Sequence, residues 1–168
     1  MKSSLIHSKK GFTIIETLVY LGLYAIIMGG AITAVYTIFS SSAHNQTQAM
    51  IQEEGSYLLG KIDWVLSNAH TVEEPVSTGS VLSIIRFDGS SASISQNGKD
   101  MQIIEGSYPL QVLNNTNITI RDLVFIHTNS SADGINPESV QASFTVYATT
   151  SDGLSFSRSF VTVKYLRK

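Results

Sequence analysis

The chain is organised around the stretch Lys9-Lys10-Gly11-Phe12-Thr13-Ile14-Ile15-Glu16, where a short basic leader meets a long apolar run. Between Phe12 and Phe39 the only formal charge is that of Glu16, close to the beginning of the run. A helix needs about 20 apolar residues to cross a bilayer, so this run is long enough to span a membrane. A carboxylate inside such a run is costly in lipid, which predicts a functional role and a partner for Glu16.

Three interpretations of the run are open from topology alone: a signal peptide, an ordinary anchor, or a segment that later leaves the membrane. A signal peptide has an apolar core of about 7–15 residues, and the run from Phe12 to Phe39 is longer than that. The lysines before the run predict an N-terminus in the cytoplasm, by the positive-inside rule. We therefore expect a single-pass protein whose C-terminus lies outside the cytoplasmic membrane.

The composition limits the class of the rest of the protein. The 168 residues include no cysteine and only 14% charged residues, so disulfides and thiolate metal sites are excluded. Without the lysines of the first eleven residues, the formal net charge falls from −2 to −5, which gives no broad basic surface for nucleic acid. The sequence contains no nucleophile elbow and no phosphate-binding glycine loop, so we expect neither an enzyme nor a cofactor.

The junction resembles the N-terminal signature (a class III signal) of the type IV prepilin and pseudopilin family. In this pattern basic residues, here Lys9-Lys10, and a glycine, here Gly11, precede a cut, and Phe12 leads an apolar segment with Glu16 four residues later. Tyr20 departs from the pattern, since a small residue often stands there. The resemblance implies cleavage between Gly11 and Phe12 by a prepilin peptidase, N-methylation of Phe12, and assembly into a filament.

The chemistry of the junction agrees with that implication. A cut after Gly11 would create a new α-amine on Phe12 in a setting of low dielectric constant. The carboxylate of Glu16, in the same chain or a neighbour, would then be an opposite charge for this amine. Removing one partner of a buried ion pair costs about 3–5 kcal/mol, so the pair is suited to fixing axial register.

After the apolar run, the spacing predicts that one helix continues from about Thr13 to about Ala69, with an amphipathic part over residues 40–70. Gly55 interrupts its apolar stripe, and Glu73-Glu74-Pro75 ends the pattern. Trp64, the only tryptophan, is predicted to be a half-buried anchor against a sheet. The apolar stripe is formed by Met50, Ile51, Leu58, Leu59, Ile62, Val65, Leu66 and Ala69.

Beyond Pro75 the period changes from that of a helix to that of strands. The predicted strands are 81–87, 92–95, 101–105, 117–126, 140–148 and 156–165. Turn signals lie at Asp88-Gly89, Asn97-Gly98 and Asp152-Gly153, and the last two strands are predicted to form an antiparallel hairpin that closes the sheet. The fold class is therefore α+β and pilin-like: a cleaved leader (1–11), a transmembrane or filament-core helix (12–39), its amphipathic continuation (40–70) and a β-rich head (76–168).

We expect a structural subunit of a type IV pilus-like or type II secretion pseudopilus filament. The order of elements resembles a minor, J-type pseudopilin or a minor pilin. The implied partners are prepilin peptidase, other pilin or pseudopilin subunits, an inner-membrane assembly platform, and membrane lipid before assembly. The implied location is the bacterial inner membrane, followed by a cell-surface or periplasmic filament.

The alternative is a binding module of a competence or adhesion pilus, which holds DNA or a surface ligand. The basic cluster that could contact DNA is Lys164, Arg167 and Lys168, for which a solvated chain end is the favoured interpretation. Three scattered histidines, His44, His70 and His127, lack acidic companions at ligand spacing, so we expect no metal site there. Aspartates such as those of Asp133-Gly134 and Asp152-Gly153 are assigned to turns rather than to Ca²⁺.

Overall fold

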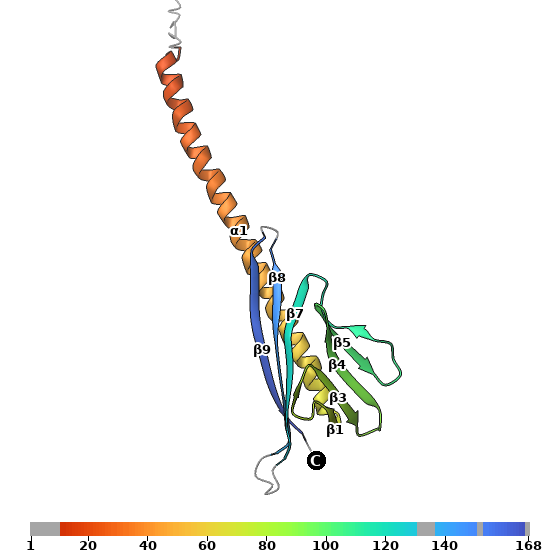
Figure 1. The fold of residues 1–168 in the computed structure, drawn as a ribbon. Helices are drawn as coiled ribbons and strands as arrows, with labels where there is room; N and C mark the ends of the chain where they lie inside the picture. The colour runs from red at the N-terminus through yellow and green to blue at the C-terminus, as the bar shows by residue number, and fades with distance from the viewer. Residues whose placement is uncertain (1–10, 131–136, 151–152, 167–168) are drawn as a thin grey trace, which may run out of the picture. The chain divides into compact units, whose positions relative to one another are not determined.

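A computed structural model describes residues 11–130, 137–150 and 153–166 of the chain (Figure 1). The chain divides into two compact units, Met1–Ser42 and Ala43–Lys168, each described by itself below. The elements are α1 (Ile14–Ser67), β1 (Ala69–Glu74), β2 (Thr78–Gly79), β3 (Val81–Arg86), β4 (Ser91–Asn97), β5 (Asp100–Glu105), β6 (Gln111–Val112), β7 (Ile118–Thr128), β8 (Ser139–Thr149) and β9 (Ser155–Tyr165).

The predicted fold class is confirmed: one long apolar N-terminal helix is followed by antiparallel strands, in an α+β arrangement. The strands form two sheets, however, rather than the single sheet that we expected. One sheet has the order β1-β3-β4-β5-β6 and the other has the order β2-β7-β8-β9. Alternation of apolar residues identifies the longer strands from β3 onward but not their neighbours. β1 was missed because its burial does not alternate, and β2 and β6 are too brief to show a period.

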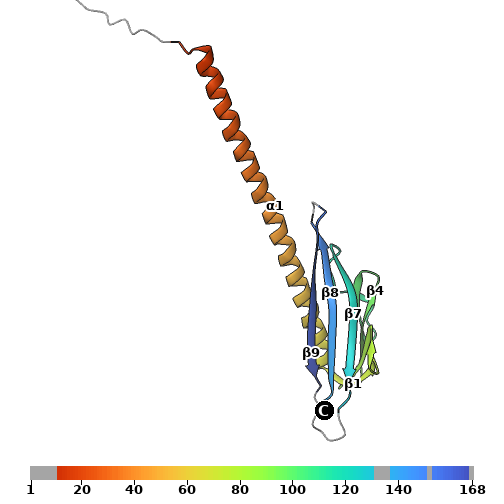
Figure 2. The same ribbon diagram turned by 60° about the vertical axis from the view of Figure 1, so that its left-hand side comes forward.

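The C-terminal part of α1 packs on the sheets, as the two views of the ribbon show (Figures 1 and 2). The predicted stripe is confirmed in its main members, with Gly55 as an added one. Gly55 is therefore part of the buried face and does not interrupt it, because the ring of Phe160 on β9 occupies the space where a Cβ would stand. The buried residues of α1 are Thr47, Ile51, Gly55, Leu58, Ile62, Val65 and Leu66.

The predicted helical segment 40–70 is too long at its C-terminal end, since α1 ends at Ser67. The side chains of Ser67 and Asn68 donate hydrogen bonds to the carbonyl oxygens four residues earlier, at 2.7 and 3.0 Å. The bond from Asn68 satisfies the carbonyl group of Trp64, one of those that the last helical turn leaves free. The chain then continues as β1, Ala69–Glu74, which pairs antiparallel with β3, so the β-rich head begins before residue 76.

The hairpins follow their turn signals. Gly89 and Gly98 have φ angles of 80° and 60°, values that glycine adopts without a steric penalty, at the turns before β4 and β5. β8 and β9 pair antiparallel along their whole length, from Ser139↔Tyr165 to Thr149↔Ser155, as the sequence predicted. The predicted loop at Asp133-Gly134 lies outside the described residues, as does Asp152.

Gln96 joins the two sheets at an irregularity of β7. The pairing of β7 with β8 shifts between Arg121 and Val124, and Asp122 has a φ of 56°, which is uncommon for a residue other than glycine. The amide of Gln96, on β4, donates to the carbonyl oxygen of Ile120 at 3.0 Å and accepts from the N–H of Leu123 at 3.2 Å. One side chain thus replaces ladder bonds that the bulge removes.

Candidate functional site

The predicted cleavage position lies just before the first turn of α1. Gly11 and Phe12 are described and exposed, and neither belongs to a helix or a strand. The side chain of Phe12 is 76% exposed, and nothing lies within 4 Å of a Cβ placed on Gly11. The peptide bond between them is therefore sterically accessible. Lys9 and Lys10, predicted as the basic part of the signal, lie outside the described residues.

Thr13 caps the helix, and Glu16 lies in its first turn. The backbone N–H of Glu16 donates to the hydroxyl oxygen of Thr13 at 3.3 Å. Thr-x-x-Glu is the sequence of a capping box, and this spacing was a signal that our sequence interpretation did not use. An acid in the first turn also interacts favourably with the helix dipole. The helix cap and the helix dipole therefore offset part of the energetic cost of the charged side chain of Glu16.

The carboxylate of Glu16 receives its side-chain hydrogen bond from Tyr20. The Tyr20 hydroxyl donates to Oε1 of Glu16 at 3.4 Å, one turn further along α1. The ring of Tyr20 also meets the ring of Phe12 edge to face, with centroids 6.2 Å apart and planes at 77°. In the uncleaved chain the nitrogen of Phe12 is part of a peptide bond, so its pairing with Glu16 stays a prediction for the cleaved chain.

The helical part of the first unit presents apolar side chains to its surroundings on all sides. Among the described residues, α1 is the one helix long and apolar enough to cross a membrane, judged by length and composition, and none of its most apolar window is buried. Thr33 and Thr37 direct their hydroxyls to carbonyl oxygens of the preceding turn, both at 2.9 Å, which satisfies these groups within the helix. Gly22, Gly29 and Gly30 face open space.

The three histidines occupy separate places in the second unit. His44 packs near the ring of Phe156, and His70 near the ring of Phe87. Within the described part of the chain, no three His, Cys, Asp or Glu residues cluster as metal ligands. His127 does have an acidic companion, since its Nε2 lies 2.9 Å from Oε1 of Glu138, eleven residues further along the chain.

His127 ties two parts of the fold together. Its Nδ1 lies 3.1 Å from the carbonyl oxygen of Pro75, and its backbone N–H donates to the carbonyl oxygen of Ser77 at 2.7 Å. With Glu138 on its other side, the buried ring links the segment before β2 to the start of β8. These contacts give His127 a structural role in the described fold.

The basic cluster of the alternative interpretation is described only at Lys164. Its Nζ lies 4.0 Å from Oδ2 of Asp63 on α1, a long and partly exposed ion pair within the second unit. Arg167 and Lys168 lie outside the described residues. The contact with Asp63 is a specific observation against Lys164 as a free phosphate-binding group.

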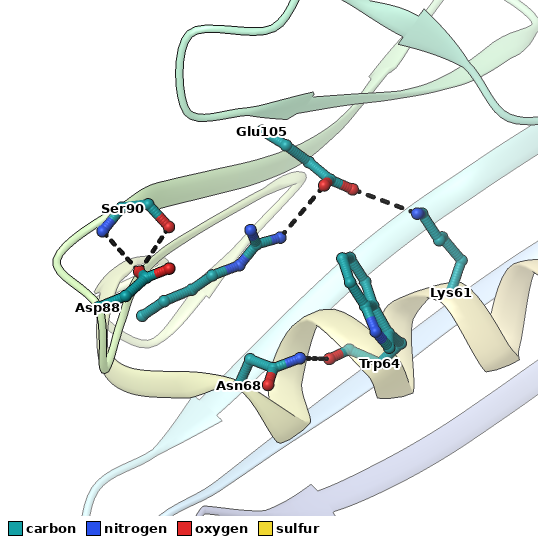
Figure 3. A network of polar contacts seen from close by, with 7 residues as sticks. Lys61, Trp64, Asn68, Asp88, Ser90 and Glu105 are labelled. Carbon is teal, nitrogen blue, oxygen red and sulfur yellow. Dashed lines mark hydrogen bonds and ion pairs between the residues drawn. The ribbon is translucent and has the colours of Figure 1, made fainter.

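Trp64 forms a cluster that sequence reasoning anticipated only in part. Trp64 is more exposed than the predicted half-buried position, with 44% of the residue exposed. The Nζ of Lys61 and the Cζ of Arg86 lie 4.3 and 4.9 Å from the Trp64 ring centroid, at cation–π distance. Glu105 on β5 bridges both cations, at 3.2 and 3.4 Å (Figure 3). Lys61 and Trp64 are three residues apart on α1, but Arg86 and Glu105 come from β3 and β5, so no sequence spacing assembles the whole cluster.

A surface cavity of about 380 Å³ lies beside this cluster and includes Asp88 in its lining. The hydroxyl of Ser90 and then its backbone N–H, both donating to Oδ1 of Asp88, lower the pKa of the Asp88 carboxyl below its ordinary value. Figure 3 shows both bonds within the turn after β3. Asp88 is therefore held by its own turn. The cavity is lined by Trp64, Asn68, Arg86, Phe87 and Asp88.

Comparison of the chain with protein-family models, with curated proteins and with solved structures gave no match. What is shown is therefore the α+β fold and one N-terminal helix capable of crossing a membrane.

Proposed function

We propose that this chain is a structural subunit of a type IV pilus-like or type II secretion pseudopilus filament, and specifically a minor one. The observation that carries the proposal is the start of α1, where Glu16 lies in the first turn and is the one charged residue between Phe12 and Phe39, a stretch whose large apolar side chains are exposed. In an ordinary anchor this carboxylate contributes only to the helix cap and the dipole, whereas in a filament subunit it can also receive an amine from a neighbour.

The accessible bond between Gly11 and Phe12 supports the processing step of the proposal. Prepilin peptidase cuts this bond, and Phe12 is then N-methylated. The new N-terminus is the cationic partner of Glu16. Before the cut, the subunit stays in the bacterial inner membrane with its C-terminus outside, because the lysines of the leader favour the cytoplasmic side.

During assembly, the lipid around the apolar part of α1 is replaced by the helices of neighbouring subunits. The subunit binds other pilin or pseudopilin subunits on an inner-membrane assembly platform, and the second unit becomes the surface of the filament. Small residues such as Gly22 and Gly29, whose surroundings are open, allow a neighbouring helix to approach closely. Under this proposal the chain carries out no reaction of its own.

Mass spectrometry of the mature N-terminus tests the proposal. The full chain is expressed in bacterial cells with and without the prepilin peptidase of the same system. With the enzyme we expect a chain that begins at methylated Phe12, and without it a chain that keeps the leader. An N-terminus at Met1 in the presence of an active peptidase, or a cut after Ala34, would overturn the proposal.

A further inference from the structure

Phe12, Glu16 and Tyr20 lie on one face of the chain at the start of α1. Glu16 and Tyr20 are four apart on α1, an offset of only about 40°, so their side chains meet, whereas Phe12 precedes the helix. The contacts agree with the spacing: the Tyr20 hydroxyl reaches Oε1 of Glu16, and its ring reaches the ring of Phe12. Tyr20 thus contacts both Phe12 and Glu16. In the proposed function, the amine of Phe12 and the carboxylate of Glu16 form the charge pair after cleavage.

The hydroxyl of Tyr20 differs in its partner from the threonine hydroxyls of the same helix. Those of Thr17, Thr33 and Thr37 donate to backbone carbonyl oxygens four residues earlier, at 2.9–3.2 Å. The hydroxyl oxygen of Thr13 accepts the backbone N–H of Glu16 and leaves the carboxylate untouched. Over the described residues 11–42, Tyr20 is therefore the side chain that donates to the carboxylate.

We infer that Tyr20 is a positioning residue for Glu16, an inference that rests on the proposed function. Its hydroxyl holds Oε1 on the face that bears Phe12 and provides a hydrogen bond to the carboxylate while the helix is in lipid. A carboxylate offers about four acceptor positions on its two oxygens, so the bond from Tyr20 leaves Oε2 open for an amine. Tyr20 therefore prepares Glu16 for the incoming amine and does not compete with it.

The ring of Tyr20 makes a second contact, with the ring of Phe12. Its edge-to-face contact with Phe12 places the aromatic group that follows the cut on the same side as the carboxylate. In the cleaved chain the contact limits the positions that the new amine can take. The hydroxyl and the ring of Tyr20 consequently make separable contributions, which two substitutions distinguish.

The first measurement is the carboxyl-carbon signal of Glu16 in the full chain, labelled with ¹³C at its glutamate carboxyl groups and placed in lipid vesicles. The signal is identified by its loss in Glu16→Gln. We expect Tyr20→Phe to shift this signal, because the hydrogen bond to the carboxylate is lost. Tyr24→Phe is the matched control, one turn further along α1, and should leave the signal in place. An unshifted signal in Tyr20→Phe overturns the inference.

The second measurement is incorporation of the subunit into filaments. A hydrogen bond to a charged group is worth about a tenfold change in an equilibrium, so we expect Tyr20→Phe to reduce incorporation about tenfold with normal leader cleavage. Tyr20→Leu, which also loses the ring contact, should be more impaired. If Tyr20→Phe assembles as the unmodified chain does while Tyr20→Leu fails, packing alone explains Tyr20 and the inference is wrong.

The two measurements separate failure of the inference from failure of the proposed function. Absence of cleavage and incorporation in the unmodified chain would remove the proposed function and, with it, any role of Tyr20 in assembly. The carboxyl signal would still report whether Tyr20 holds Glu16 in the membrane. An unshifted signal in a chain that is cleaved and assembled would remove only the role of Tyr20.

Discussion

The ring of Phe160, on β9, lies against the backbone of Gly55 in the middle of the buried face of α1. The same ring stacks on Phe144 of β8, with centroids 5.7 Å apart and planes at 19°. A helix, two strands and two aromatic rings therefore meet at a position where only a hydrogen atom fits. The glycine that weakens the helix locally is the residue that lets the sheet approach it.

Gly55→Ala should destabilise the second unit. Alanine gains about 1 kcal/mol of helix propensity over glycine, but overpacking typically costs about 1–3 kcal/mol, and the added methyl group overlaps the Phe160 ring. We expect a net loss of up to about 2 kcal/mol in the free energy of unfolding of the full chain in detergent, measured with denaturant and followed by Trp64 fluorescence. Gly60→Ala is the control, because its Cβ meets nothing within 4 Å and should be neutral or stabilising.

Gln96→Ala should separate the two sheets at the bulge of β7. The substitution removes the bond to the carbonyl oxygen of Ile120 and the bond from the N–H of Leu123, both part-buried. Leaving such groups unsatisfied costs about 1–3 kcal/mol each, so we expect a loss of about 2 kcal/mol or more in the free energy of unfolding. Gln52→Ala, which breaks only an exposed contact with Ser56, should change it little. Equal effects of the two substitutions would contradict a linking role for Gln96.

Glu105→Gln should destabilise the cluster around Trp64. Glu105 supplies the balancing charge for Lys61 and for the guanidinium of Arg86, because its two carboxylate oxygens lie 3.2 and 3.4 Å from these cations. Lys61, Arg86 and Glu105 are partly exposed. We therefore expect the free energy of unfolding to fall by about 1–2 kcal/mol, between the values typical of surface and of buried ion pairs. Hydrogen exchange at the β3–β5 backbone should rise together with this loss. Glu53→Gln, on the exposed face of α1, serves as the comparison.

Asp88 should give the β3–β4 turn a pH dependence. Its folded-state pKa lies below the ordinary carboxyl value of about 3.9, so its contribution to stability is present above that pH and is lost as the pH falls through the folded-state pKa. We expect the stability difference between the unmodified chain and Asp88→Asn to shrink below about pH 4. Ser90→Ala, which removes the principal cause, should raise the pKa of Asp88 in an NMR titration. An unchanged titration would count against the hydroxyl as the cause.

Glu16→Ala should block assembly without blocking processing. Loss of one partner of a buried charge pair costs about 3–5 kcal/mol, which corresponds to a reduction of about a hundredfold or more in incorporation. Leader removal, measured by the mass of the chain, should be normal because the cut precedes pairing. Glu53→Ala provides a control for removing an acid elsewhere on α1. Filaments that accept the Glu16→Ala subunit at the normal level would rule out the pairing.

The sequence by itself determined the elements whose cause is local. The apolar run with its single acid predicts the helix and its capacity to cross a membrane, because length and hydropathy are properties of contiguous residues. Alternation predicts the long strands, and Gly89 and Gly98 mark turns because their positive φ angles suit glycine. The contact between Glu16 and Tyr20 also follows a four-residue spacing, so it was accessible to the same reasoning.

The tertiary structure alone decided the features that depend on distant residues. The division of the strands into two sheets, the bridge from Gln96 to β7 and the cluster of Lys61, Arg86 and Glu105 around Trp64 join elements that no sequence spacing relates. The buried place of Gly55 likewise depends on Phe160, far along the chain. A local pattern indicates which secondary structure a residue prefers. Which distant residue it contacts is decided only by the packing of the whole unit.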